Sequence, residues 1–172
     1  MDSAIVLSPC QTYRYALWRI WENTMPWVMF VGLNPSTADE LHNDPTARRC
    51  IGFARDWGYG GVCITNVFAY RSTTPRRLRW VDDPIGVEND RWLTNLSQQA
   101  ALVVVAWGNH GTLAQRDQAV LSLLNQPYYL SLTKRGQPAH PLYLRKELKP
   151  IRWQYETQQT NQGISPHSNH QR

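Results

Sequence analysis

A chain of 172 residues is long enough to bury a stable hydrophobic core without disulfide bonds or structural metals, and it leaves little room for a second folded domain. Lysine and arginine number 18 against 13 acidic residues, and the resulting net charge of +5 favours a polyanionic partner. The three cysteines lie far apart without a Cys-x-x-Cys pair, which argues against a disulfide framework and against a zinc site.

The sequence also lacks the features of export and of membrane insertion. No apolar stretch approaches the roughly eighteen residues that a spanning helix needs, and the N-terminus lacks the charged start and apolar core of a signal peptide. We therefore expect a cytoplasmic protein that contacts no membrane and needs neither a metal nor another cofactor.

The first predicted elements are strands. Residues 13–21 alternate loosely between polar and apolar side chains and precede turn residues at 22–26, which predicts a β-hairpin leading into a sheet. Residues 27–32 are apolar on both faces, as in a buried parallel strand. This strand ends at Gly32 and is followed by Asn34-Pro35, at the kind of position where open α/β sheets bind ligands. An ordinary strand-to-loop turn would give the same pattern.

Helices and strands alternate after this loop. Asp44 followed by Pro45 predicts a helix N-terminus, with the helix continuing to Trp57. Further strands are expected at 61–68, 101–108 and 128–132, with helices opening near residue 82 and running from 112 to about 124. The order predicts an α/β fold, a three-layer sandwich whose mainly parallel central sheet has about four strands. Residues 1–155 would form this single domain, and the polar residues 156–172 are predicted to be a disordered tail.

Three strand-end segments occur in a suggestive order: Gly32-Leu33-Asn34-Pro35, Ile64-Thr65-Asn66 and His140-Pro141. Together they resemble the uracil-DNA glycosylase superfamily, in which a Gly-x-x-Pro loop activates water and the last motif begins with His-Pro. The resemblance covers most of residues 27–146 and implies a glycosylase-like fold without an iron–sulfur cluster. The chain also looks like a bacterial domain family of uncharacterised function that carries the Asn-Pro-Ser-Thr-Ala-Asp signature.

The resemblance implies a catalytic group. Asn34 would hold the attacking water, and His140 would stabilise charge on the departing base. An amide cannot accept a proton, so a carboxylate is missing, and either Asp39 or Asp44 is near enough in sequence to supply it. Each also has a structural interpretation, as a loop-stabilising residue for Asp39 and as the helix N-cap for Asp44. We favour the cap for Asp44 and place Asp39 in the catalytic set.

The same resemblance implies a base-binding group. Asn66 would read the base edge, because its amide offers one donor and one acceptor; its structural alternative is an Asx-turn at the strand end. Phe68 and Tyr70 lie near the same strand end and are the candidates for stacking on the base. Phe30 lies inside its strand and is expected in the core.

Basic residues follow the second predicted strand and surround the His-Pro motif. The residues expected to contact DNA phosphates are Arg71, Arg76, Arg77, Lys134, Arg135 and Arg145. Leu142 and Tyr143 stand where the resembled family places a wedge into the base stack. A solvated basic face is the alternative for the charges, and the start of a terminal helix is the alternative for Leu142 and Tyr143.

These observations lead to one hypothesis with two alternatives. The leading hypothesis is a DNA glycosylase-like hydrolase that cleaves the N-glycosidic bond of a uracil-like or modified base flipped out of DNA. The alternatives are a non-catalytic module that captures a flipped or modified base, and a hydrolase of small nucleosides or nucleotides on the same fold. DNA is the expected partner, and a monomer is favoured.

Overall fold

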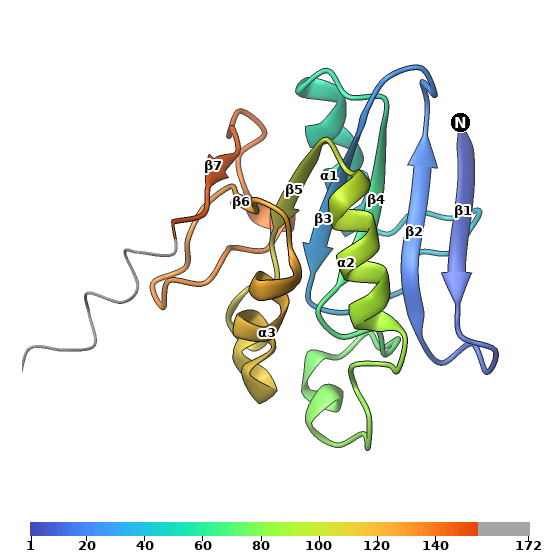
Figure 1. Cartoon of the computed structure of the whole chain (residues 1–172), viewed down its shortest axis with the longest axis vertical. Coiled ribbons are helices and arrows are strands. Elements are labelled where there is room, and N and C mark those ends of the chain that lie inside the picture. Colours follow the sequence, from blue (N-terminus) through green and yellow to red (C-terminus); the bar gives the residue numbers. More distant parts are fainter. Residues whose placement is uncertain (155–172) are drawn as a thin grey trace, which may run out of the picture.

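Seven strands form one sheet in the computed structural model, which describes residues 1–154 (Figure 1). In sheet order they are β1 (Asp2–Leu7), β2 (Arg14–Ile20), β4 (Gly61–Asn66), β3 (Trp27–Gly32), β5 (Leu102–Val105), β6 (Tyr128–Tyr129) and β7 (Ile151–Arg152). The four central strands, β4, β3, β5 and β6, run parallel. The predicted α/β class and the parallel centre are confirmed, and antiparallel strands extend the sheet at both edges.

Helices cover both faces of the sheet, which makes three layers. Helix α1 (Pro45–Asp56) packs on one face, and α2 (Asn89–Gln99) and α3 (Arg116–Leu123) pack on the other, in front of the sheet in Figure 1. Three short 3-10 turns complete the fold: η1 (Pro75–Arg79), η2 (Asn109–Gln115) and η3 (Pro141–Tyr143).

Successive side chains along each strand point to opposite faces of the sheet, so alternate residues pack against different helices. Val28 and Phe30 of β3 join the core beneath α1, whereas Met29 and Val31 join the core beneath α2 and α3. The same alternation on β4 directs Ile64 toward α1. Gly32 and Asn66, at the next alternate positions of β3 and β4, therefore lie on the α1 side of the sheet.

A hairpin precedes the parallel strands, but it is formed by β1 and β2. The strand predicted at 13–21 is its second strand, and the turn predicted at 22–26 does not close it. β1 and β2 pair antiparallel, and β2 then pairs with β4, with Leu17 opposite Ile64. The turn at 22–26 thus joins β2 to a strand that is not its neighbour, because β4 inserts between β2 and β3.

Several predicted boundaries shift for local reasons. α2 begins at Asn89 and not near residue 82, because the Asp83 carboxylate accepts from the N–H groups of Ile85 and Gly86 and closes a separate turn. α3 begins at Arg116 because η2 occupies the residues before it. The last predicted strand shortens to β6.

Two properties concern residues 1–154 only. Across this range, none of the helices has the length and apolar character required to cross a lipid bilayer. The same residues bring no three His, Cys, Asp or Glu side chains together in a way that would hold a metal ion. The tail predicted at 156–172 lies outside the described residues.

Candidate functional site

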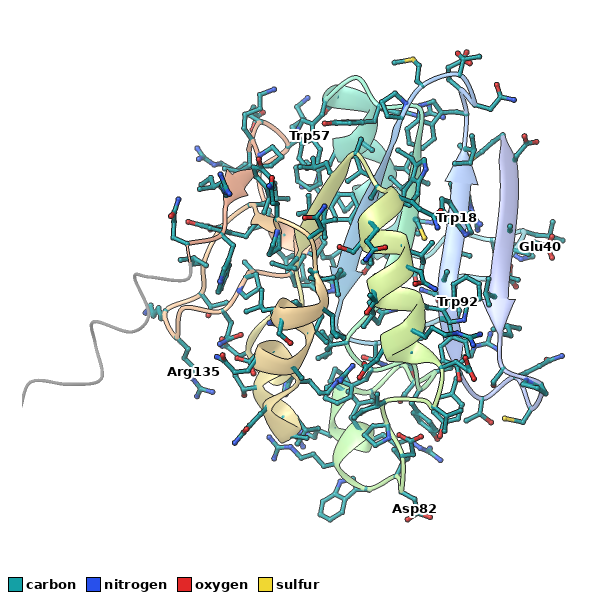
Figure 2. All side chains as sticks on the ribbon, in the orientation of Figure 1. Trp18, Glu40, Trp57, Asp82, Trp92 and Arg135 are labelled. Atoms are coloured by element: carbon teal, nitrogen blue, oxygen red, sulfur yellow. The ribbon has the colours of Figure 1, made fainter. Side chains whose placement is uncertain are left out.

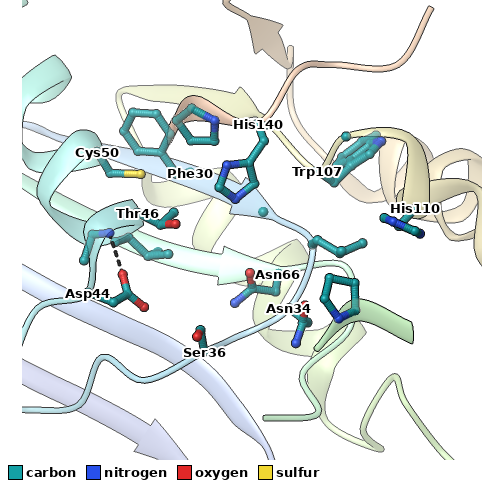
Figure 3. Close-up of a pocket in the computed structure, with 18 of the residues that line it drawn as sticks. Phe30, Asn34, Ser36, Asp44, Thr46, Cys50, Asn66, Trp107, His110 and His140 are labelled. Carbon is teal, nitrogen blue, oxygen red and sulfur yellow. Dashed lines mark hydrogen bonds between the residues drawn. The ribbon is translucent and has the colours of Figure 1, made fainter. Parts of the chain in front are cut away.

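A cavity of about 370 Å³ opens at the carboxyl ends of the central strands (Figure 3). Gly32 at the end of β3, Asn66 at the end of β4 and Ala106 after β5 all line it. The chain leaves β3 toward α1 on one face and leaves the neighbouring strand β5 toward α3 on the other, so the two connections diverge here. In open α/β sheets a ligand crevice forms where the connections diverge in this way.

The structure brings three predicted site residues to this one cavity. Asn34 comes from the loop after β3, Asn66 from the end of β4 and His140 from the residue before η3, and all three line the wall. Figure 3 labels all three among the residues that line the cavity. Segments far apart in sequence thus converge as the ordered motifs predicted.

The side chain of Asn34 is held by the backbone. Its Nδ2 donates to the carbonyl oxygen of Ser72 at 2.8 Å and to that of Pro35 at 3.2 Å. A carbonyl can only accept, so these contacts determine which end of the amide is the nitrogen. The Oδ1 atom has no hydrogen-bond partner among residues 1–154, and it offers an acceptor to a water or ligand.

Asn66 is buried with its amide nitrogen unpaired. The residue is 4% exposed, and its buried Nδ2 has no hydrogen-bond partner in the described part of the chain. Gly32 lies opposite Asn66 in the β3–β4 register, and a Cβ there would come within 2.9 Å of the Asn66 Oδ1. An unpaired buried polar group costs about 1–3 kcal/mol, and in the cavity wall this amide is open to a hydrogen bond from a water or a ligand.

His140 is arranged as a neutral donor. Its Nδ1 accepts from the Leu142 N–H at 3.3 Å, so the neutral ring carries its hydrogen on Nε2. Burial lowers the pKa of His140, and the negative charge of Asp44 opposes this shift only in part. The imidazole can therefore donate one hydrogen bond without carrying a charge.

The lowered pKa of His140 predicts a fold that weakens in acid. An unfolded histidine has a pKa of about 6.5, whereas the folded residue takes its proton at lower pH. Between these two pKa values the unfolded state binds more protons than the folded state. The free energy of unfolding therefore decreases as the pH falls below about 6.5. Urea unfolding at about pH 7.5 and about pH 5.5 should show a smaller loss for His140→Gln than for wild type. The exposed His42→Gln serves as the control, and equal losses in all three proteins would contradict this role of burial.

Asp44 both caps a helix and faces the cavity. Its Oδ1 accepts from the Ala47 N–H at 2.8 Å and its Oδ2 accepts from the Ala38 N–H at 3.2 Å, so the predicted N-cap is confirmed. The same carboxylate lines the cavity wall. Each oxygen keeps a lone pair beyond these bonds, which leaves the group able to accept from a ligand or water.

Asp39, placed in the catalytic set from the sequence, is elsewhere. Its Oδ1 accepts from the backbone N–H groups of Leu41 and His42 and pairs with the His42 ring at 3.0 Å. It does not line the cavity. The structure corrects this expectation, because the loop turns the Asp39 side chain toward its own residues while the start of α1 carries Asp44 to the strand ends.

Arg14 is a wall residue that the sequence did not reveal. It is 3% exposed, its Nη1 donates to the Ala38 carbonyl at 2.9 Å, and its Nε has no partner among residues 1–154. Burial lowers the pKa of Arg14 to about 10, against the opposing charge of Asp44, so the guanidinium stays protonated at neutral pH. The cavity wall thus holds one cation and one carboxylate. An arginine at the start of a strand carries no sequence signal that separates it from a solvated one.

Phe30 and Trp107 line the cavity, whereas Phe68 and Tyr70 do not. Phe30 lines the cavity wall, and its ring stacks on the Trp57 ring with 6.1 Å between the two ring centroids. Phe68 is fully buried beneath α2 and α3, because β4 ends at Asn66 and the chain then leaves the pleat. Tyr70 is half-buried and packs edge-on against Tyr13. The structure therefore corrects the predicted stacking residues.

The residues predicted to contact DNA lie on the surface around several loops. Arg76, Arg77, Lys134, Arg135, Tyr143 and Arg145 are exposed, and Arg71 and Leu142 are half-buried. Arg71 donates to the Gln11 carbonyl. The residues after His140 form only the single turn η3, not a terminal helix, and Tyr143 at its end is 91% exposed.

The chain is an α/β protein with a cavity at the carboxyl ends of its parallel strands. Residues 14–142 match the family described as "Protein of unknown function (DUF1643)", and the chain belongs to this family. The match begins at Arg14 and includes His140 and Pro141, so it contains every residue of the cavity wall. No curated protein and no solved structure matches the chain.

Proposed function

We propose that this protein is a DNA glycosylase-like hydrolase that cleaves the N-glycosidic bond of a uracil-like or modified base flipped out of DNA. The observation that carries the proposal is the convergence of Asn34, Asn66 and His140 on one cavity. These are the residues for which the resemblance to the uracil-DNA glycosylase superfamily implies roles. The three layers around a parallel centre support the same relationship.

Base recognition in this proposal rests on Asn66 and Phe30. The Asn66 amide, whose Nδ2 is unpaired, offers a donor and an acceptor, which match a carbonyl oxygen and the adjacent ring N–H of a pyrimidine. The Phe30 ring supplies an apolar face. The cavity volume of about 370 Å³ lies within the range of small-molecule sites.

Hydrolysis needs a placed water and stabilisation of the departing base. The Asn34 Oδ1 orients a water toward the sugar C1′, the bond from C1′ to the base nitrogen breaks, and its electron pair leaves with the base. The His140 Nε2–H donates to the base carbonyl where negative charge develops. The Asp44 carboxylate takes the proton that the water loses, and that proton afterwards neutralises the released base. Arg14 places a positive charge on the same cavity wall as Asp44.

The proposal is tested by base release from defined oligonucleotides. Purified protein is incubated with single-stranded and duplex DNA carrying uracil, hypoxanthine or 5-substituted pyrimidines, and abasic sites are then cleaved with alkali. We expect strand breaks with at least one of these bases, and a loss of at least about tenfold in Asn34→Ala and His140→Ala. Asn95→Ala and His42→Ala, at exposed positions outside the cavity, should match wild type.

Two results would contradict hydrolysis of DNA. Salt-dependent DNA binding without abasic sites on any substrate would indicate a non-catalytic base-binding module. Release of free base from nucleosides, together with weak DNA binding, would indicate a nucleoside hydrolase on the same fold.

A further inference from the structure

An exposed tryptophan lies a few residues after a segment that lines the cavity. Trp80 directly follows η1 and is 82% exposed, whereas Leu78 in the same turn is buried and anchors the turn to the core. Thr73 and Pro75 line the cavity, and Thr74 between them lines a shallow hollow shared with Trp80. The cavity and the hollow therefore share one segment of chain, and the hollow places an exposed indole on that segment.

The same segment carries cations without partners. Arg76, Arg77 and Arg79 are exposed, and none of them forms an ion pair with any residue of 1–154. Residues 71–80 contain no acidic side chain, and the first one after them is Asp82, at the lower end of the molecule in Figure 2. Arg76 and Arg77 line the hollow together with Trp80. A cationic hollow with an aromatic wall is complementary to a nucleotide, which has a phosphate and a flat base.

We propose that the segment from Arg76 to Trp80 is a platform for single-stranded DNA, on which Trp80 stacks against a base adjacent to the one that enters the cavity. This assignment of neighbouring bases rests on the proposed function. In a duplex both faces of each base are covered by stacking, so a protruding indole finds no partner without unstacking. In a single strand the base faces are free, and base–aromatic stacking is the usual way such strands are held. Arg76 and Arg77 contact the phosphates on either side.

The platform is tested by binding, separately from base release. A labelled oligonucleotide of roughly 12 nucleotides without a modified base is titrated as a single strand and as a duplex, and fluorescence anisotropy is recorded at two salt concentrations. We expect the single strand to bind more tightly. Trp80→Ala should weaken this binding roughly 5- to 100-fold, and Trp80→Phe should retain most of it. Arg76→Gln with Arg77→Gln should reduce the salt dependence.

Two exposed controls lie at the other end of the sheet, in the turn before β3 and near the end of α1. Met25→Ala and Arg55→Gln should leave the affinity unchanged. Binding of the duplex as tight as that of the single strand, or a Trp80→Ala affinity within twofold of wild type, would overturn the platform. Trp80-dependent binding without base release from any substrate would retain the platform and reject the proposed hydrolysis. If Trp80→Ala released base as wild type does and bound DNA with unchanged affinity, the platform would be rejected and the proposed hydrolysis retained.

Discussion

Replacing Asp44 with asparagine is expected to lower base release by at least about a hundredfold, because general-base groups contribute roughly 10²- to 10⁴-fold. Asparagine is as good an N-cap as aspartate, so the bond from the Ala47 N–H is retained. The bond from the Ala38 N–H is lost, which should reduce the free energy of unfolding by about 1 kcal/mol. The variant therefore separates the carboxylate from the cap, and it is measured by alkali-revealed strand breaks and by urea unfolding.

The comparison with two other variants makes this result specific. Asp56→Asn removes a charge from the exposed far end of the same helix and should retain wild-type activity. Asp44→Ala also removes the cap bond and should lose about 1 kcal/mol more stability than Asp44→Asn. An Asp44→Asn protein that releases base within threefold of wild type would show that Asp44 is only a cap.

Replacing Asn66 with leucine is expected to abolish base recognition without weakening the fold. Leucine has a similar shape and removes the unpaired buried Nδ2, so the free energy of unfolding should stay constant or rise by about 1–3 kcal/mol. A site built to hydrogen-bond its substrate loses several orders of magnitude when that match is destroyed, and we expect at least about a hundredfold loss of base release.

A second buried asparagine provides the matched control for stability. Asn89 is fully buried, and its Nδ2 donates to the carbonyls of Asn66 at 2.9 Å and Val67 at 3.2 Å. Asn89→Leu leaves these backbone acceptors without that donor and should destabilise the fold by about 2 kcal/mol. If Asn66→Leu destabilised the protein as much as Asn89→Leu, the Asn66 amide would be structural.

The convergence of the site could be expected from the sequence because each motif follows a strand. Parallel strands present their carboxyl ends at one edge, so Asn34 after β3 and Asn66 on β4 meet once the strands are aligned in register. The Asp44 cap was equally predictable, since Asp followed by Pro at a helix start acts through neighbouring residues alone.

The wrong predictions concern side chains whose position depends on where a strand ends or how a loop runs. Phe68 would have shared the face of Asn66 if β4 had continued, but the strand ends and Phe68 packs in the opposite layer. Phe30 belongs to the core and to the cavity at once, because the strand containing it reaches the open end of the sheet. Asp39 and Asp44 have the same chemistry, and only the path of the loop decides which one faces the cavity.

The α/β class, the parallel centre, the capped helix and the order of the three motifs could all be predicted from the sequence, because periodicity, turn residues and caps act over a few neighbouring positions. Three features emerge only from the folded chain: β4 inserts between β2 and β3, Arg14 and Asp44 share the cavity wall, and Trp80 is exposed after η1. These features depend on contacts between residues distant in the chain. Such contacts form through strand pairing and burial, and they cannot be recognised in a short stretch of sequence.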